Sequence, residues 1–546
     1  MADDKDSGAN EFFRQHYTTP DFGGAAKPRP KANGQDTADY QSGGEFPGIT
    51  WKDGDLANIT DLAEQALIDA DAPVYQRGKS LVCPGRWELK ASGNRLTTAA
   101  ALVVQDVAGI RDMLARHTLW QVWDARAKRM KRTDPPIVVA QTLLARAGRW
   151  RLKSIIGIVT TPVLRPDGSV LTEPGYDEAT RLYLQHDATL TMPAMPGAPV
   201  KAEAEAALVL LQGLLTEFPF TSPVDRSVAL SALITPLARG AITVAPMHAI
   251  GATTAGTGKS YLIDVCSTIA AGRPCPVISL STDVEETEKR LGGLLLAGVS
   301  MISIDNVNGI LKSDMLCQAV ERPIVQIRRL GGSDMFDVES RASIYGTGNN
   351  LTLAGDLTRR GLRCFMDAEM ERPEKRQFEH DPVRIVLANR GAYIAACLTI
   401  VRAYIAAGSP DKPIPLPSYG DWSNTVRSAL IWLGQSDPVD SMETLAKMDP
   451  DRQELSDTLE AWYAFRAGDQ YTLRELIADV QHGASLEAEM LRDAFTAIAG
   501  VRGGIDGRRL GDWCRRNEGR IAGRMVLRRG SSDEHVGVAR WRVQYT

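Results

Sequence analysis

The sequence lacks any uninterrupted apolar run of about 18 residues, the length that a helix needs to cross a bilayer. Its beginning, MADDKDSGANEFF, is acidic and polar, whereas a secretory signal has a basic segment followed by an apolar one. These two absences argue against a membrane span and a secretory signal. We therefore expect a cytoplasmic protein with no membrane partner.

Clustered metal ligands are also missing. The seven cysteines are scattered without a CxxC pair, and the seven histidines form no HExxH motif or Cys/His cluster. A structural zinc site or a disulfide framework needs such clustering. We expect the cysteines to be small buried side chains in a reducing compartment.

Neither sign of charge predominates, because 63 Lys and Arg stand against 67 Asp and Glu, for a formal net charge of -4. Any nucleic-acid site must therefore be local. The chain has 546 residues, 44% of them apolar and 24% charged. This composition is typical of globular proteins, and the length exceeds what one hydrophobic core supports. We expect several folded domains.

A glycine-rich segment, Gly251-Ala-Thr-Thr-Ala-Gly-Thr-Gly-Lys-Ser260, follows the apolar run MHAI and precedes the helix-like YLIDVCSTIA. Such a loop turns backbone N–H groups towards phosphates, while its lysine adds positive charge and its serine ligates Mg²⁺. Thr253 stands where the usual pattern has its first glycine. We expect ATP and Mg²⁺ here. The predicted nucleotide-binding residues are Ala255, Gly256, Thr257, Gly258, Lys259, Ser260 and Tyr261.

A second apolar run, GVSMISID over 298–305, ends in Asp305 and is followed by Asn306. Asp305 is predicted to hold Mg²⁺ with Ser260, and Asn306 to help place the attacking water. An amide cannot take a proton as a carboxylate does. Either Asn306 only orients water, or a carboxylate elsewhere is the base, with Glu285 and Glu286 as weak candidates.

A third run, ASIYGTGNN over 342–350, ends in polar residues and is followed by Gly355-Asp-Leu-Thr-Arg-Arg360. An amide at a strand tip beside a nucleotide can sense the γ-phosphate, and paired arginines can reach the nucleotide of a neighbouring subunit. The competing interpretation is that Arg359 and Arg360 are solvated helix charges.

With these motifs the sequence resembles the superfamily 3 helicases of the AAA+ class, in particular the helicase half of phage, plasmid and poxvirus-type primase-helicases. The resemblance is specific over about 247–380. It implies a hexameric ring with nucleotide between subunits and single-stranded DNA in the central pore. It also implies that Asn349, or its neighbour Asn350, is the sensor and that Arg359 or Arg360 acts in trans. No primase motif is evident, so priming would need a separate primase or polymerase.

One candidate DNA contact lies in PIVQIRRLGGSDMFDV over 323–338, which predicts two short strands around a Gly-Gly turn. In the helicases that the sequence resembles, a hairpin in this interval projects into the pore. Arg328 and Arg329 would then track the DNA backbone; the competing interpretation is that they are exterior hairpin charges.

Two further basic segments are candidates. The last 46 residues hold eleven Arg against five Asp or Glu, and they predict a helix over 508–517 and a two-stranded wing, as in winged-helix DNA binders. The alternative interpretation is that these basic residues form a solvent-exposed face that binds no DNA. Trp513 and Trp541 are expected in the core. The predicted phosphate contacts are Arg515, Arg516, Arg528 and Arg529. A weaker run, RAKRMKR over 126–132, could bind DNA, although isolated charge runs usually face solvent.

The periodicity along the chain predicts an α/β protein, with a helix over 100–117 and a parallel sheet over 205–400 that has helices on both faces. The expected parts are a disordered tail (1–50), an N-terminal α+β domain (51–204), an AAA+-type P-loop ATPase core (205–400), a helical lid or linker (401–470) and a basic winged-helix-like domain (471–546). The phrase ERPEKRQF over 371–378 also looks like the phage group but suggests no physical role.

The expected function is an ATP-dependent, ring-forming DNA helicase that replicates a phage or mobile element in the bacterial cytoplasm. Its partners would be single-stranded or forked DNA and further copies of the chain. The first alternative is a DNA-binding AAA+ initiator or loader that hydrolyses ATP without separating strands. The second is a phosphoryl-transfer enzyme acting on a small substrate.

Overall fold

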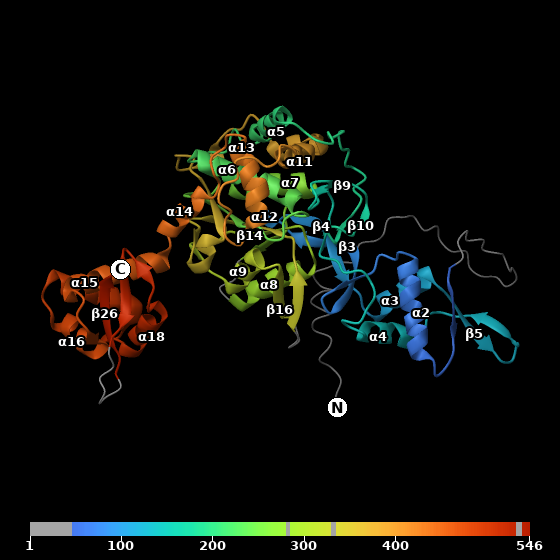
Figure 1. Ribbon diagram of the computed structural model, residues 1–546, viewed down its shortest axis with the longest axis horizontal. Helices are drawn as coiled ribbons and strands as arrows, with labels where there is room; N and C mark the ends of the chain where they lie inside the picture. The colour runs from blue at the N-terminus through green and yellow to red at the C-terminus, as the bar shows by residue number, and fades with distance from the viewer. Residues whose placement is uncertain (1–45, 280–283, 329–334, 531–537) are drawn as a thin grey trace. The chain divides into compact units, whose positions relative to one another are not determined.

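The computed structural model describes residues 46–279, 284–328, 335–530 and 538–546 (Figure 1). These residues form two compact units. The larger contains the described chain up to Gly309 together with Ser313–Leu351 and Arg360–Ser441, and the smaller contains Ile310–Lys312, Thr352–Arg359 and Met442–Thr546. Two short segments of the predicted 205–400 core therefore belong with the C-terminal residues.

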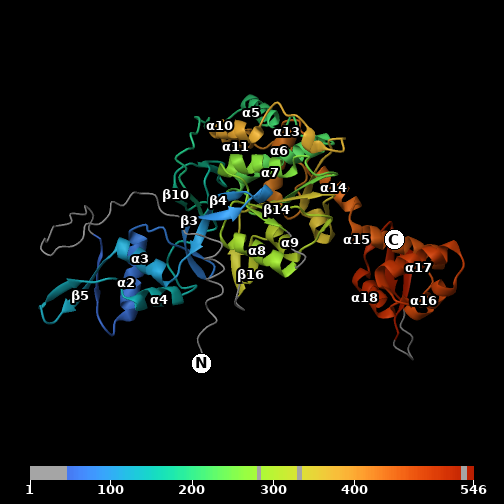
Figure 2. The same cartoon turned by 180° about the vertical axis from the view of Figure 1, so that it is seen from behind.

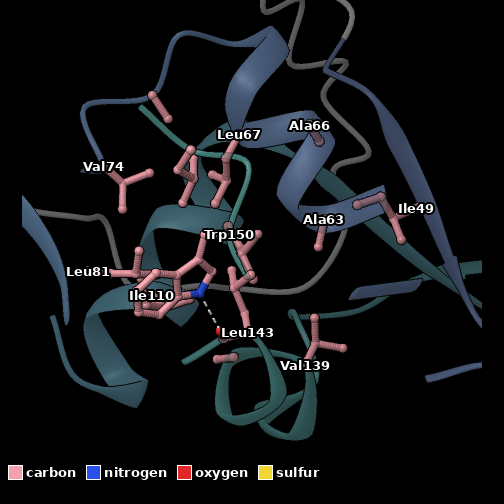
Figure 3. Close-up of a cluster of buried hydrophobic side chains, with 14 of the residues drawn as sticks. Ile49, Ala63, Ala66, Leu67, Val74, Leu81, Ile110, Val139, Leu143 and Trp150 are labelled. Atoms are coloured by element: carbon pink, nitrogen blue, oxygen red, sulfur yellow. Dashed lines mark hydrogen bonds between the residues drawn. The ribbon is translucent and has the colours of Figure 1, made fainter. Parts of the chain in front are cut away.

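The N-terminal part of the larger unit, up to Leu152, has its own hydrophobic core, which three helices cover. α2 (Leu56–Asp69), α3 (Val107–His117) and α4 (Ile137–Ala145) contribute apolar side chains to this core. Figure 3 shows the core, in which the indole N–H of Trp150 donates a hydrogen bond to the Leu143 carbonyl at 2.7 Å. That bond satisfies the polar end of a large buried ring.

The predicted tail over 1–50 extends too far. β1 (Gly48–Trp51) pairs in parallel with β5 (Leu119–Asp124), which in turn pairs with β6 (Arg129–Arg132). Ile49 joins the apolar core, and its burial explains why this segment is part of the fold. The rest of that prediction, residues 1–45, lies outside the described chain.

A long hairpin follows α2. β3 (Ser80–Lys90) pairs antiparallel with β4 (Leu96–Val104), β2 (Tyr75–Arg77) adds a third strand, and η1 (Ser92–Asn94) forms the tip. The helix predicted over 100–117 is wrong for its first residues, which belong to β4. Pairing with β3 along the whole strand outweighs the helical spacing of its apolar residues.

Smaller sheets lead from this region towards the main sheet. β11 (Leu182–Leu184) lies between β7 (Gly157–Val159) and β10 (Gly175–Asp177), while β8 (Val163–Leu164) pairs with β9 (Val170–Leu171). Their buried side chains form a separate small cluster.

The predicted parallel sheet is present, which confirms the α/β class. Its strand order is β13-β14-β18-β12-β20, and every neighbouring pair is parallel. The strands are β12 (Met247–Ala252), β13 (Val277–Ser279), β14 (Met301–Asp305), β18 (Ser343–Asn349) and β20 (Gly361–Met366). The order puts β18 between β12 and β14, although β18 follows both in the sequence.

Helices cover both faces of this sheet, as expected for parallel strands. α6 (Pro223–Ala238) and α7 (Lys259–Ala271) lie on one side, and α8 (Val284–Leu296) and α9 (Asp314–Glu321) lie on the other (Figures 1 and 2). Further helices of this unit are α5 (Lys201–Gly213), α10 (Pro382–Ala388), α11 (Arg390–Ala406), α12 (Gly420–Trp422), η4 (Ser423–Arg427) and α13 (Ser428–Trp432).

No single helix among the described residues has the length and apolar content needed to cross a membrane. α10 and α11 meet that criterion only as a pair, and they are bent by 95° relative to each other.

The predicted hairpin over 323–338 is present as β16 (Ile324–Arg328) and β17 (Met335–Glu339), which pair antiparallel. Its turn, 329–334, lies outside the described residues. Val325, Ile327 and Val338 are buried, so the body of this hairpin packs against the rest of the unit.

The smaller unit has its own core of helices and an antiparallel sheet. Its strand order is β21 (Tyr471–Thr472), β26 (Arg540–Tyr545), β25 (Met525–Arg529) and β24 (Ile521–Ala522). α15 (Pro450–Arg466) contributes Leu455, Leu459 and Trp462 to this core. The residues predicted as a lid or linker over 401–470 are therefore divided between the two units. Trp513 and Trp541 are 4% and 3% exposed, which confirms their prediction as core residues.

The elements of the smaller unit include the predicted helix and wing strands. They are α15 (Pro450–Arg466), α16 (Leu473–His482), α17 (Leu486–Ala499), α18 (Gly507–Asn517), β15 (Ile310–Leu311), β19 (Thr352–Leu353), η2 (Gly355–Arg359), β21 (Tyr471–Thr472), β22 (Gly500–Val501), β23 (Gly504–Ile505), β24 (Ile521–Ala522), β25 (Met525–Arg529) and β26 (Arg540–Tyr545), with α14 (Asp440–Lys447) at the unit boundary.

A buried arginine joins the N-terminal part of the larger unit to its sheet layer. The Arg77 guanidinium, in a residue that is 4% exposed, donates hydrogen bonds to the carbonyls of Leu295 and Leu296 at 2.6 and 2.9 Å. It also donates to the carbonyls of Ile155 and Ile156. Burial lowers the pKa of Arg77 to about 10. Because Leu296 ends α8, the cation caps carbonyls that have no partner within the helix.

We predict that Arg77→Met destabilises the larger unit, because a bond from a charged donor contributes about 1.5–3 kcal/mol. Its loss removes the guanidinium donor from the carbonyls of Leu296, Ile155 and Ile156. The Leu295 carbonyl would keep its bond from the Gly298 N–H. The midpoint of denaturant unfolding, followed by tryptophan fluorescence, should fall relative to the wild type. Arg126→Met is the matched control, since Arg126 is exposed in the same unit. Equal midpoints for Arg77→Met and the control would contradict the capping role.

Candidate functional site

The glycine-rich segment forms a loop between β12, which ends at Ala252, and α7, which begins at Lys259. Gly256 and Gly258 have φ of 76° and 106°, in the left-handed region that favours glycine. Thr253 has no positive φ and its side chain is exposed. The departure from the usual pattern at Thr253 therefore causes no strain.

The Lys259 ammonium lies at the centre of this loop. It donates hydrogen bonds to the Thr254 carbonyl at 2.9 Å and to Asn349 Oδ1 at 2.7 Å. Burial lowers the pKa of Lys259, and the nearby charge of Asp305 opposes that shift. Both bonded partners are neutral oxygens, so an incoming anion would meet a cation that is not neutralised by direct pairing with an acid.

The Asp305 carboxylate connects the acid strand to the loop. Oδ1 accepts hydrogen bonds from the Ser260 hydroxyl at 3.0 Å, from the Asn306 N–H at 3.0 Å and from the Thr347 hydroxyl. Oδ2 accepts one from the Ser92 hydroxyl at 2.7 Å. A serine hydroxyl beside a carboxylate supplies the hard oxygen ligands that Mg²⁺ prefers, so the donor set at Ser260 and Asp305 fits this ion.

Asn306 and the two alternative bases lie in different settings. Asn306 is exposed with φ of 57°, a conformation that asparagine tolerates. On α8, Glu285 lies 3.4 Å from Lys289, and Glu286 lies 3.0 Å from Arg290. Both glutamates thus form i,i+4 pairs typical of a helix surface. Nothing in these contacts links them to Asp305, whereas the backbone of Asn306 is bonded to it.

The structure distinguishes between the two sensor candidates. The Asn349 side chain contacts the Lys259 ammonium, whereas the Asn350 N–H donates to the Ala252 carbonyl at 3.0 Å in a turn where φ is 50°. Asn349 is therefore the amide that lies at the loop.

The adjacent arginines Arg359 and Arg360 have different surroundings in the structure. Arg359 ends η2 in the smaller unit, where its exposed guanidinium lies 3.4 Å from Asp356. Arg360 is 6% exposed and pairs with Glu321 of α9. Its backbone carbonyl accepts from the Met247 N–H, which places the residue directly before β20, beside β12. The Arg360 side chain is thus buried and paired within its own subunit, and its contact with a neighbouring nucleotide stays a prediction.

A cavity of about 560 Å³ opens beside the loop. It is lined by Phe218, Tyr261, residues 256–258 and residues between Glu374 and Pro382. The Phe218 and Tyr261 rings stack with centroids 6.4 Å apart. The lining combines the aromatic rings of Phe218, Tyr261 and Phe378 with charged side chains such as Glu217 and Arg376. A planar heterocycle can stack on aromatic walls of this kind, with the charged groups around it.

Residues between Glu374 and Pro382 form part of the wall of this cavity. Three residues of the phrase ERPEKRQF, Glu374, Arg376 and Phe378, therefore have a structural role that the sequence alone did not suggest. The Tyr261 hydroxyl donates to Asp381. Burial, together with this bond, raises the pKa of Tyr261 to about 12, and the same bond lowers the pKa of Asp381. A Cβ on Gly256 would lie 3.0 Å from Glu374, so the wall requires glycine at that position as well.

The candidate DNA contacts are spread over both units. Arg328 ends β16, and Arg329 lies outside the described residues. In the smaller unit, Arg515 is 63% exposed and pairs with Asp512 along α18. Arg516, Arg528 and Arg529 are exposed as well.

The weaker basic run forms an exposed hairpin, β5–β6. All four residues of β6 are exposed, and Trp123, opposite Met130 in the pairing, is 56% exposed. The cations of this basic hairpin form no ion pairs within the described chain. They are Arg126, Lys128, Arg129, Lys131 and Arg132.

Comparisons with known proteins identify no family for this chain and only distant structural neighbours. No protein-family model and no curated protein matches the chain. An A form apo structure of the NrS-1 C terminal region aligns with 89% of this chain and 98% of its own, at 11% identity and a TM-score of 0.35. A second such structure of that region aligns with 88% of this chain and 98% of its own, at 11% identity and a TM-score of 0.33.

Proposed function

We propose that the chain is an ATP-dependent DNA helicase of the superfamily 3, AAA+ type that works as a ring, with a P-loop ATPase core. The observation that carries the proposal is the meeting of Lys259, Ser260, Asp305 and Asn349 at the carboxyl ends of three adjacent parallel strands. Ligands of open α/β sheets bind in the crevice at this end. The proposed setting is replication of a phage or mobile element in the bacterial cytoplasm.

The loop residues suit a triphosphate. Backbone N–H groups around Gly256 and Gly258 would face the phosphates, and the Lys259 ammonium would exchange its neutral partners for phosphate oxygens. Ser260 and Asp305 would hold Mg²⁺, which neutralises charge on the transferred phosphoryl group when bound. Phe218 and Tyr261 would contact the base in the adjoining cavity.

Hydrolysis needs an oriented water and compensation of charge in the transition state. Asn306 would orient the water and Asn349 would sense the γ-phosphate. With Arg360 buried, the exposed Arg359 is the arginine that we propose to act on the nucleotide of a neighbouring subunit, in a ring whose expected size is six.

DNA contact would come from the basic hairpin β5–β6, the hairpin β16–β17 and the winged-helix-like smaller unit. Exposed cations beside an exposed aromatic ring suit single-stranded nucleic acid, because the charges follow the backbone and a base can stack on the ring. An initiator or loader would use the same surfaces without separating strands, whereas a small-substrate phosphoryltransferase would not need them.

The central prediction concerns Lys259→Ala, which removes the phosphate-binding cation and should lower DNA-stimulated ATP hydrolysis on the order of 10²–10³-fold. Turnover and displacement of a strand from forked DNA are the measurements. Lys289→Ala, on the surface of α8, is the control and should leave both unchanged. Wild-type turnover by Lys259→Ala would refute the site. DNA-stimulated turnover without displacement would indicate the loader, and turnover indifferent to DNA would indicate the phosphoryltransferase.

Phe218→Ala should weaken binding of a fluorescent ATP analogue about tenfold or more, since stacking of a base on an aromatic ring contributes roughly 1–3 kcal/mol. Phe378→Ala, a second aromatic change at the same cavity, tests whether the loss is specific to the Phe218 ring. Unchanged affinity of Phe218→Ala would place the base elsewhere.

Charge reversal in the basic hairpin should weaken single-stranded DNA binding and its dependence on salt. For Arg129→Glu/Lys131→Glu we expect the slope of log affinity against log salt to fall by about 1.4, because each lost phosphate contact removes about 0.7. Arg116→Glu, on α3 of the same unit, is the control. An unaltered slope in fluorescence anisotropy titrations would rule out this surface.

A further inference from the structure

The tip of the β3–β4 hairpin, residues 91–95, touches the acid of the candidate ATP site. The Ser92 hydroxyl donates to Asp305 Oδ2 at 2.7 Å, across 213 positions of sequence. Three donors, from Ser260, Asn306 and Thr347, converge on the other oxygen, Oδ1. The hydrogen bond from Ser92 therefore fixes the rotation of the carboxylate from its second side.

The hairpin is held in this position along the edge of the parallel sheet. Ala91 forms an antiparallel bridge with Pro276, next to the edge strand β13. The Thr97 hydroxyl donates to the Pro274 carbonyl at 2.8 Å, and Arg273 donates to the Thr98 carbonyl at 2.8 Å. These bonds cover an otherwise open strand edge and define where the tip can lie.

An ion pair with a buried carboxylate also holds the tip of the β3–β4 hairpin in place. Arg95 pairs with Asp264 of α7, whose side chain is only 5% exposed. Burial raises the pKa of Asp264, and the bond from Arg95 acts against that shift. Asp264 and Asp305 repel each other, so the Arg95 cation also offsets negative charge beside the acid strand.

We propose that Ser92 is a positioning residue for Asp305, so that the N-terminal hairpin completes the ATP site of its own subunit. This inference rests on the proposed ATPase function. Asp305 would hold Mg²⁺ with Ser260, and the Ser92 hydroxyl keeps the second carboxylate oxygen, Oδ2, in a defined direction for that role. Partners that orient metal-binding carboxylates typically alter metal affinity 10–100-fold when removed.

The test compares Ser92→Ala, Ser92→Thr and Thr97→Val. We measure the Mg²⁺ concentration that gives half-maximal turnover at saturating ATP, and the affinity for a fluorescent ATP analogue with Mg²⁺ or with EDTA. Ser92→Ala should need about tenfold more Mg²⁺ and should lose affinity only when Mg²⁺ is present. Ser92→Thr keeps a hydroxyl and should restore both values.

Thr97→Val is the matched control, because it removes a bond that docks the hairpin and leaves the bond to Asp305. It should have the wild-type Mg²⁺ requirement. An equal rise in the Mg²⁺ requirement of Thr97→Val and Ser92→Ala would mean that Ser92 only docks the hairpin. An unchanged Mg²⁺ requirement in Ser92→Ala would mean that Ser92 does not position Asp305. Either result overturns the inference and leaves the ATPase proposal intact. If Ser92→Ala fails to fold, a wild-type Mg²⁺ requirement in Ser92→Val would likewise overturn the inference. A wild-type chain that binds no ATP overturns both proposals.

Discussion

The parallel register of three neighbouring strands governs the whole candidate site. Ala252 of β12 lies opposite Asn349 of β18, and Gly346 of β18 lies opposite Ile304 of β14. This register brings Lys259, the Asn349 amide and Asp305 to one end of the sheet, although Lys259 and Asn349 are 90 positions apart in sequence. A slip of one residue in a strand would turn the side chain of Asn349 or Asp305 to the opposite face of the sheet.

The parts of this site that could be predicted from sequence are those with local signatures. A glycine loop between strand and helix, an apolar strand ending in Asp305 and a polar strand end at Asn349 each lie within a few residues of the pattern that marks them. The parallel sheet follows from their alternation with helices. These predictions required no knowledge of which distant segments meet.

The missed features depend on distant contacts or on the direction of a side chain. Two adjacent arginines look alike in sequence, yet Arg360 is buried and pairs with Glu321, while Arg359 is exposed and lies beside Asp356. Phe218 precedes the loop by about forty residues and meets the cavity wall only in the folded chain. Ser92 is a small polar residue in a tight turn, and no local pattern relates it to Asp305.

The capping of α8 by Arg77 and the covering of β13 by the hairpin have a consequence for how the protein can be divided. A fragment starting near residue 205, the domain border expected from the sequence, would carry an uncapped helix end, an unpaired strand edge and an Asp264 carboxylate deprived of its counter-ion. Such a fragment would tend to associate through its bare edge. A stable fragment that contains the parallel sheet therefore has to include the N-terminal helices and the β3–β4 hairpin, together with the contacts by which they dock on α7, α8 and the segment before β13.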